Sequence, residues 1–164
     1  MKAEAPEPFG LLNVLKPPGM SAHDVVGAVR RVVGTKRVGH GGTLDPAAAG
    51  VTTVAVGKAT RLLGYLHDDK AYRAEVVFGM ATDTVDHEGT IIAEADASGL
   101  TREAVEAALA AFRGPIVQRP PMASAVHFQG KRLYELARAG IALPEEAIPT
   151  RSVVVHALHL LEFE

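Results

Sequence analysis

An uncharged, valine-rich run from Pro46 to Gly57 limits most strongly what this chain can fold into. No charged residue occurs between Asp45 and Lys58, so the run suits the interior of a protein and not its surface. Its β-branched residues and the glycines at its ends predict a buried strand over residues 50–57.

Other segments carry strand and helix patterns that mix without strict alternation. Strands are predicted over residues 10–16, 72–80, 90–95, 124–128 and 151–164. Helices are predicted over residues 22–33, 58–66 and 102–112, with a further helix that ends at Gly140. The first helix has Ser21 and Asp24 as a capping box, Gly34 as its end and an apolar face of Val25, Val26, Val29, Val32 and Val33. The pattern favours an α+β fold with a mixed, mainly antiparallel sheet flanked by helices.

The size and composition of the chain indicate one globular domain. Its 164 residues suit a single core, with residues 1–8 as a flexible tail and residues 9–164 as the domain. Cysteine is absent, and the N-terminus has no apolar stretch of signal-peptide length. No apolar run reaches the ~20 residues of a membrane helix. The sequence therefore predicts a cytoplasmic protein with no membrane partner.

Charge is unevenly distributed, although the formal net charge is only −2. Residues 9–63 hold seven Lys/Arg against two Asp, a balance of +5, whereas residues 64–113 hold four against ten, a balance of −6. Residues 114–140 return to +3, with four basic residues against one acidic residue. Two basic segments around an acidic one are consistent with a polyanionic partner and equally with an ordinary solvated surface.

Asp45 is the only acid in a turn made of small residues. An Asp-Pro pair most often marks a turn or helix start, in which the carboxylate caps the following amides. Here Gly39, Gly41, Gly42 and Gly50 surround Asp45, and glycines let the main chain approach a ligand closely. With no acidic neighbour, the carboxylate does not fit a two-carboxylate glycosidase site. It fits a lone nucleophile or base that acts on a polyanionic substrate.

Four ordered sequence blocks between Phe9 and Thr150 resemble those of the TruB family of tRNA pseudouridine synthases. The block GHGGTLDPAAAGVTTVAVGKATRL is similar to the family's catalytic-aspartate motif. The blocks GLLNVLKPPGMSAHDVVGAVRR, DKAYRAEVVFGMATDTVDHEGT and FRGPIVQRPPMASAVHFQGKRLYELARAG are similar to its N-terminal, tyrosine-bearing and proline-rich regions. The resemblance implies a pseudouridine synthase-like fold.

The resemblance also implies a reaction and roles for individual residues. Such enzymes isomerise a uridine in the T-loop of tRNA (position 55) to pseudouridine, after flipping the base out, with no metal and no organic cofactor. Asp45 matches the catalytic aspartate, Tyr72 the tyrosine that stacks on the target base, and His40 the histidine that helps hold the loop with the base flipped out. The remaining substrate-binding residues would be Gly42, Thr43 and Leu44. Without the family, Tyr72 would be read as a core or edge aromatic residue and His40 as an ordinary loop histidine.

Supporting roles follow from the same resemblance. Lys16 and Pro17 match the N-terminal motif and are expected to brace the Asp45 loop. The candidate phosphate contacts for the T-arm of tRNA are Arg30, Arg31, Lys36, Arg37, Lys58 and Arg61. Part of this cluster also fits a helix C-terminus, which favours cations. Two other functions stay open: a non-catalytic fragment that binds the T-loop, and a relative that depends on a guide RNA.

The sequence departs from the family pattern at several points. Ala123 stands where a tyrosine is usual, and His127 where a lysine is common. The family's later arginine motif and RNA-binding tail have no counterpart, so the domain is expected to lack its C-terminal part, and this chain alone to be folded but inactive or strongly impaired. The last predicted strand would then leave an exposed edge that favours self-association. No obligate protein partner is indicated.

Overall fold

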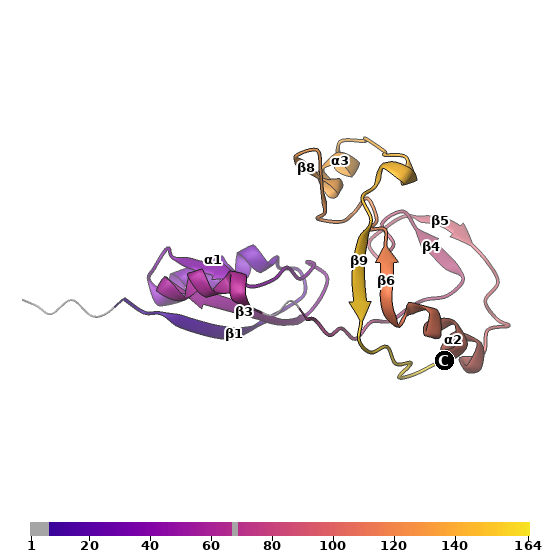
Figure 1. The fold of residues 1–164 in the computed structure, drawn as a ribbon, viewed down its shortest axis with the longest axis horizontal. Helices are drawn as coiled ribbons and strands as arrows, with labels where there is room; N and C mark the ends of the chain where they lie inside the picture. The colour runs from indigo at the N-terminus through magenta and orange to yellow at the C-terminus, as the bar shows by residue number, and fades with distance from the viewer. Residues whose placement is uncertain (1–6, 67–68) are drawn as a thin grey trace, which may run out of the picture. The chain divides into compact units, whose positions relative to one another are not determined.

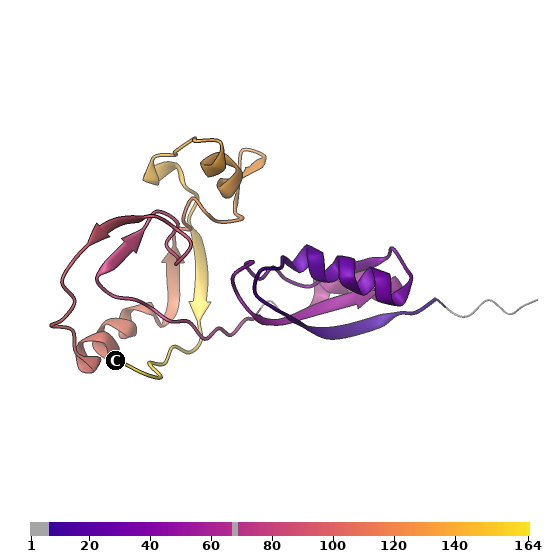
Figure 2. The same ribbon diagram turned by 180° about the vertical axis from the view of Figure 1, so that it is seen from behind.

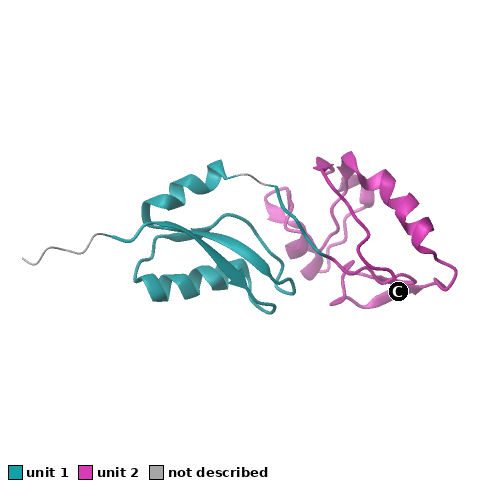
Figure 3. Ribbon diagram, turned by 90° about the horizontal axis from the view of Figure 1, so that it is seen from below, with its two compact units in different colours: residues 1–73 teal, residues 74–164 magenta. Residues whose placement is uncertain are grey.

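The computed structural model describes residues 7–66 and 69–164, which belong to two compact units, residues 1–73 and residues 74–164 (Figure 3). Each unit combines helices with antiparallel strand pairs, so the predicted α+β class with mainly antiparallel pairing is confirmed. Within the described residues, no helix is both long and apolar enough to cross a membrane. The predicted single domain over residues 9–164 stays a prediction.

The first unit contains a three-stranded sheet with the uncharged run at its centre. Its strands are β1 (Gly10–Lys16), β2 (Val38–His40) and β3 (Gly50–Val56), in the order β1-β3-β2. All pairs are antiparallel, with Gly10 opposite Val56 and Lys16 opposite Gly50. The strands predicted at residues 10–16 and 50–57 are therefore confirmed, and the register places the end of β1 beside the start of β3.

Helix α1 (Ala22–Val33) covers one face of this sheet. Ser21 and Asp24 form the predicted capping box, and Gly34 ends the helix in a left-handed conformation with φ 70°. Val25, Val26 and Val29 pack against strand residues of the sheet in one buried cluster. Val32 was predicted on the same face, but 86% of its surface is exposed. Val32 lies at the edge of the apolar stripe near the helix end, where the sheet does not cover it.

The other face of the sheet is partly covered, on the β2 side, by η1 (Gly57–Tyr65), a 3₁₀ helix where the sequence predicted a helix over residues 58–66. A Cβ atom on Gly39 would lie 3.0 Å from Leu63 Cδ1, and one on Gly41 would lie 3.0 Å from Leu66 Cδ1. These two glycines therefore make room for leucines of the covering segment. This packing explains both glycines without a ligand, and the sequence-based interpretation that they let a ligand approach stays a prediction. Figure 3 shows the sheet between its two helical layers.

The second unit contains three separate two-stranded sheets (Figures 1 and 2). The strand pairs are β4 (Met80–Thr82) with β5 (Ile91–Glu94), β6 (Gly114–Gln118) with β9 (Arg151–Val155), and β7 (His127–Phe128) with β8 (Lys131–Arg132). The helical segments are α2 (Arg102–Leu109), η2 (Ala110–Phe112), α3 (Leu133–Arg138) and η3 (Glu145–Ala147). Leu133, Leu136 and Ile148 form a small buried cluster.

Three strand predictions in this part of the chain are wrong in extent. Residues 72–79 have no regular structure, the strand predicted at residues 124–128 is reduced to β7, and β9 ends at Val155. A strand is defined by hydrogen bonds to a neighbour, and among the described residues these segments have no neighbour to pair with. Strand β9 pairs only with β6, and Val154 is 56% exposed. Self-association through this edge stays a prediction.

The acidic loop between β4 and β5 is held by hydrogen bonds within itself. The Thr84 hydroxyl and the Glu88 amide both donate to Asp86 Oδ1, at 2.6 and 3.0 Å, and the Thr90 amide donates to Asp83 Oδ1 at 2.9 Å. The bond from Thr84 is the main cause that lowers the pKa of Asp86 below its ordinary value. Because the pKa of Asp86 is lower in the folded state, its ionised form stabilises the loop fully at a pH above the pKa of the unfolded state. This stabilisation is lost as the pH falls through the pKa of the folded state.

Replacing Gly89 by alanine is expected to destabilise this loop by about 1–3 kcal/mol. The new Cβ would overlap Thr84 Oγ1 and lie 2.6 Å from Asp83 Oδ1, so the side chains that hold the loop would have to move. Gly99→Ala is the matched control, because no atom lies within 4 Å of the Cβ position there. Urea unfolding of both variants measures the difference. Equal free energies of unfolding would contradict a loop built around Gly89.

Candidate functional site

The turn between β2 and β3 is fixed on both sides of Asp45. On the N-terminal side, the Gly41 amide donates to Thr53 O at 2.8 Å, and His40 Nδ1 lies 2.8 Å from Gly42 O. On the C-terminal side, the Gly19 amide donates to Pro46 O at 2.8 Å. These contacts hold the backbone before and after Asp45 while leaving Asp45 itself outside them.

Lys16 connects the end of β1 to this turn. Its side chain is fully buried, and its ammonium group donates to the carbonyl oxygens of Pro17 (3.0 Å), Met20 (2.8 Å) and Pro46 (3.2 Å). A buried ammonium group is costly unless hydrogen-bond acceptors surround it, and here three acceptors do so. This is the arrangement that the predicted bracing role of Lys16 and Pro17 requires. The contact between Lys16 and Pro46 could not be predicted from local sequence, because the two residues are 30 positions apart.

The Asp45 side chain has no structural task among the described residues. It is exposed, and only its backbone oxygen is engaged, by the Ala48 amide at 3.1 Å. The alternative reading of Asp-Pro, in which the carboxylate caps the following amides, is therefore not what this turn does. The Leu44 side chain instead packs beside Gly50, where an added Cβ would lie 3.0 Å from Leu44 Cδ2. Thr43 is exposed next to them.

His40 is half-buried at the end of β2. A carbonyl oxygen can only accept, so Nδ1 must carry the proton in its contact with Gly42 O. In the neutral ring this leaves Nε2 as the acceptor. The turn thus selects one tautomer of the histidine.

Tyr72 is 68% exposed, in a segment without regular structure. No hydrogen bond or ring contact of Tyr72 occurs within the described residues. The structure therefore presents an accessible ring, as a stacking surface would need, and does not bring it into contact with Asp45.

The six predicted phosphate contacts do not gather around Asp45. Arg30, Arg31, Lys36 and Arg37 lie between the last turn of α1 and the start of β2, and Lys58 follows the end of β3. The Asp45 turn joins the other end of β3, and a strand of seven residues spans about 20 Å. Arg61 lies about one turn farther along η1.

These basic side chains also differ in their exposure and in their hydrogen bonds. Arg30 is half-buried, and its Nη2 donates to Val38 O at 3.1 Å. Arg37 makes one long contact, from Nε to Thr60 Oγ1 at 3.4 Å. The other four candidates, Arg31, Lys36, Lys58 and Arg61, are exposed. Arg30 is therefore the least available of the six to a ligand.

One basic residue that the sequence-based set omitted does reach the turn. The Lys70 side chain lies against Gly42, with Cε 3.7 Å and Nζ 3.9 Å from the position of a Cβ there. A signal existed, because Lys70 belongs to the block DKAYR that also contains Tyr72. That block was interpreted through its tyrosine alone.

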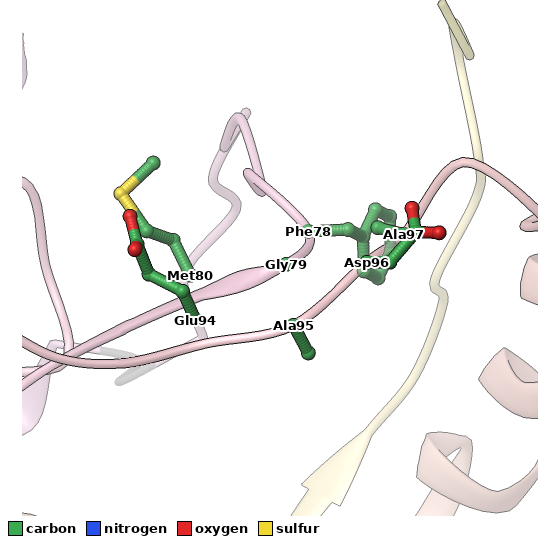
Figure 4. Close-up of a pocket in the computed structure, with 7 residues that line it drawn as sticks. All are labelled: Phe78, Gly79, Met80, Glu94, Ala95, Asp96 and Ala97. Carbon is green, nitrogen blue, oxygen red and sulfur yellow. The ribbon is translucent and has the colours of Figure 1, made fainter.

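The pocket in Figure 4 is separate from these residues. It lies along β4 and β5 and is lined by Phe78, Gly79, Met80, Glu94, Ala95, Asp96 and Ala97. In Figure 4 the Met80 and Glu94 side chains lie at one end, and those of Phe78, Asp96 and Ala97 at the other. No predicted site residue lines the pocket. Within the described parts of the chain, no group of three or more metal-binding side chains occurs.

Comparison with known proteins identifies the family. Residues 30–164 match the family model described as "TruB family pseudouridylate synthase (N terminal domain)". The chain belongs to the TruB family. The resemblance inferred from the four sequence blocks is thereby confirmed.

Relatives in the TruB family are similar along nearly the whole chain. The tRNA pseudouridine synthase B of Symbiobacterium thermophilum is 59% identical over 160 residues, which cover 97% of this chain and 52% of the relative. That of Gloeobacter violaceus is 53% identical over 154 residues, covering 94% and 52%. The chain thus spans about half the length of these relatives.

A solved structure shares the fold. The protein titled "Crystal Structure of a Cbf5-Nop10-Gar1 Complex" is 27% identical, with a TM-score of 0.59 over 95% of this chain and 36% of that one. The likeness supports the expected pseudouridine synthase-like fold for this TruB-family chain.

Proposed function

We propose that this chain carries the catalytic turn of a tRNA pseudouridine synthase, an enzyme that isomerises the T-loop uridine at position 55. The observation that carries the proposal is Asp45, an exposed carboxylate with no hydrogen bond among the described residues, in a turn fixed on both sides. A rigid turn with a free functional group is what a positioned nucleophile or base requires.

The reaction needs bond changes but no redox step. The N1–C1′ bond of uridine breaks, the base turns, and a C5–C1′ bond forms while C5 loses a proton and N1 gains one. Asp45 acts either by adding to the base or by attacking the ribose, and both routes need the ionised carboxylate. No metal and no organic cofactor enters the proposal.

The target base must leave its stack before Asp45 can reach it. Extrusion costs a few kcal/mol, and stacking on an exposed aromatic ring such as Tyr72 returns ~1–3 kcal/mol. His40, with Nε2 as its free acceptor, together with Gly42, Thr43 and Leu44, would line the space the base enters. The proposed partner is the T-arm of tRNA, contacted elsewhere by the exposed basic residues.

A second candidate function is T-loop binding without turnover. It is favoured by the fact that no basic side chain forms an ion pair with Asp45 in the described residues. A desolvated carboxylate without a cation or donors tends to take up a proton and lose its nucleophilicity. Dependence on a guide RNA is less favoured, because the tRNA-modifying relatives are 50–59% identical and the Cbf5 protein 27%.

The test is tritium release from an unmodified tRNA transcript labelled at C5 of uridine. Two proteins are compared: this chain, and a completed chain in which the second half of the Symbiobacterium thermophilum relative follows Glu164. We expect the completed chain to release one tritium per tRNA, and none when the T-loop uridine is replaced by cytidine. Binding by both proteins without release by either would favour the second function, provided that the intact relative is active in the same assay.

A further inference from the structure

Lys70 places a positive charge on the turn that presents Asp45. Its Cε and Nζ atoms lie 3.7 and 3.9 Å from the Cβ position of Gly42, so the side chain lies over the backbone at this glycine. The other glycines of the turn region face leucine side chains: Gly39 and Gly41 those of η1, and Gly50 that of Leu44. Gly42 alone among these four has an ammonium group above it.

No acidic side chain of the described residues pairs with this ammonium group. Lys70 is exposed, and no hydrogen bond or ion pair engages it within residues 7–66 and 69–164. A surface lysine usually keeps its four-carbon stem free, because ordering such a side chain costs conformational entropy. Here the stem lies across the turn without an ion pair to Asp45, which leaves the charge available to an external anion.

The position distinguishes Lys70 from the predicted phosphate contacts. All of those residues except Arg61 lie toward the end of the sheet where β3 finishes, about one strand length from the Asp45 turn. They are too far away to bind the phosphates on either side of a nucleotide seated at Asp45, since neighbouring phosphates of a single strand lie much closer together than that.

We propose that Lys70 binds a backbone phosphate next to the nucleotide that enters the Asp45 turn. The inference rests on the proposed function, because it takes the ligand to be the T-arm of tRNA. Lys70 would fix the strand beside the turn. Lys70 is thus a positioning residue and takes no part in bond changes.

The test measures affinity as a function of salt for this chain and a fluorescent T-arm hairpin. Loss of one phosphate contact reduces the slope of log K against log[salt] by about 0.7–0.9. We expect Lys70→Ala to show this reduction and to bind about tenfold more weakly at low salt, the scale of one charge-assisted contact. Lys70→Arg should keep both values. The matched control is Lys131→Ala, an exposed lysine on β8, which should leave both unchanged.

Two outcomes would overturn the inference while leaving the proposed function intact. In the first, Lys70→Ala keeps the parental slope and affinity while the completed chain isomerises tRNA. In the second, Lys70→Ala shifts the pH profile of isomerisation without changing the slope, which would make Lys70 a charge partner of Asp45 instead. If the parent chain does not bind the hairpin and the completed chain is inactive, the proposed function fails as well.

Discussion

Replacing Asp45 by asparagine is expected to abolish uridine isomerisation by the completed chain, a loss on the order of 10⁴-fold or more, as when other catalytic groups of this kind are removed. Asparagine has the shape of aspartate but carries no charge and cannot act as a nucleophile. The Asp45 carboxylate makes no hydrogen bond within the described residues, so the substitution removes no interaction that stabilises the fold. The free energy of unfolding should change by less than about 0.5 kcal/mol. Tritium release and urea unfolding measure the two effects.

The control for this substitution is Glu103→Gln, the same change of acid to amide at an exposed residue in the first turn of α2. It should leave turnover unchanged. Affinity for the T-arm hairpin should also survive in Asp45→Asn, because the phosphate contacts are elsewhere. Residual turnover within tenfold of the parent would assign the chemistry to another residue.

Replacing Lys16 by methionine is expected to lower the free energy of unfolding by about 3 kcal/mol and to reduce turnover strongly. Methionine fills a similar volume but donates no hydrogen bonds, so three carbonyl oxygens, including Pro46 O, lose their donor in a buried place. The cost of burying the ammonium group disappears at the same time, which keeps the net loss below the sum of three contacts. Urea unfolding and tritium release are the measurements.

Lys36→Met serves as the stability control, because Lys36 is an exposed lysine of the same unit. It should change the free energy of unfolding by no more than about 0.5 kcal/mol. A Lys16→Met variant as stable as the parent would show that the turn does not depend on Lys16. A stable but inactive variant would instead point to a direct role of Lys16 in the reaction.

Local signals predicted the elements whose causes are local. The capping box at Ser21 and Asp24 and the helix end at Gly34 act within a few residues, and each is found as expected. Strands β1 and β3 were predictable because apolar composition and flanking turns mark a buried strand. The segment at residues 72–79 also contains aromatic and β-branched residues typical of strands, yet whether it forms a strand depends on a distant partner that its own sequence does not contain.

The candidate site likewise combines features that local sequence predicts with features that depend on distant residues. Asp45 stands out in the sequence because the turn around it is otherwise uncharged. The contacts that fix the turn do not stand out, since Lys16 and Gly19 bind Pro46 from a distant part of the sequence, Lys16 from 30 residues away. Glycine could not be interpreted from sequence alone either: Gly39 and Gly41 make room for leucines, whereas Gly42 accommodates Lys70.

The bond from the Gly19 amide to Pro46 O gives the turn a built-in reporter. Any opening of the turn that moves Pro46 must break this bond and expose the Gly19 amide to solvent. The rate at which that single proton exchanges with deuterium therefore measures how often the turn opens. Gly19 belongs to a different segment of the chain, so its resonance follows the motion of the Asp45 turn without any label or substitution in the turn itself.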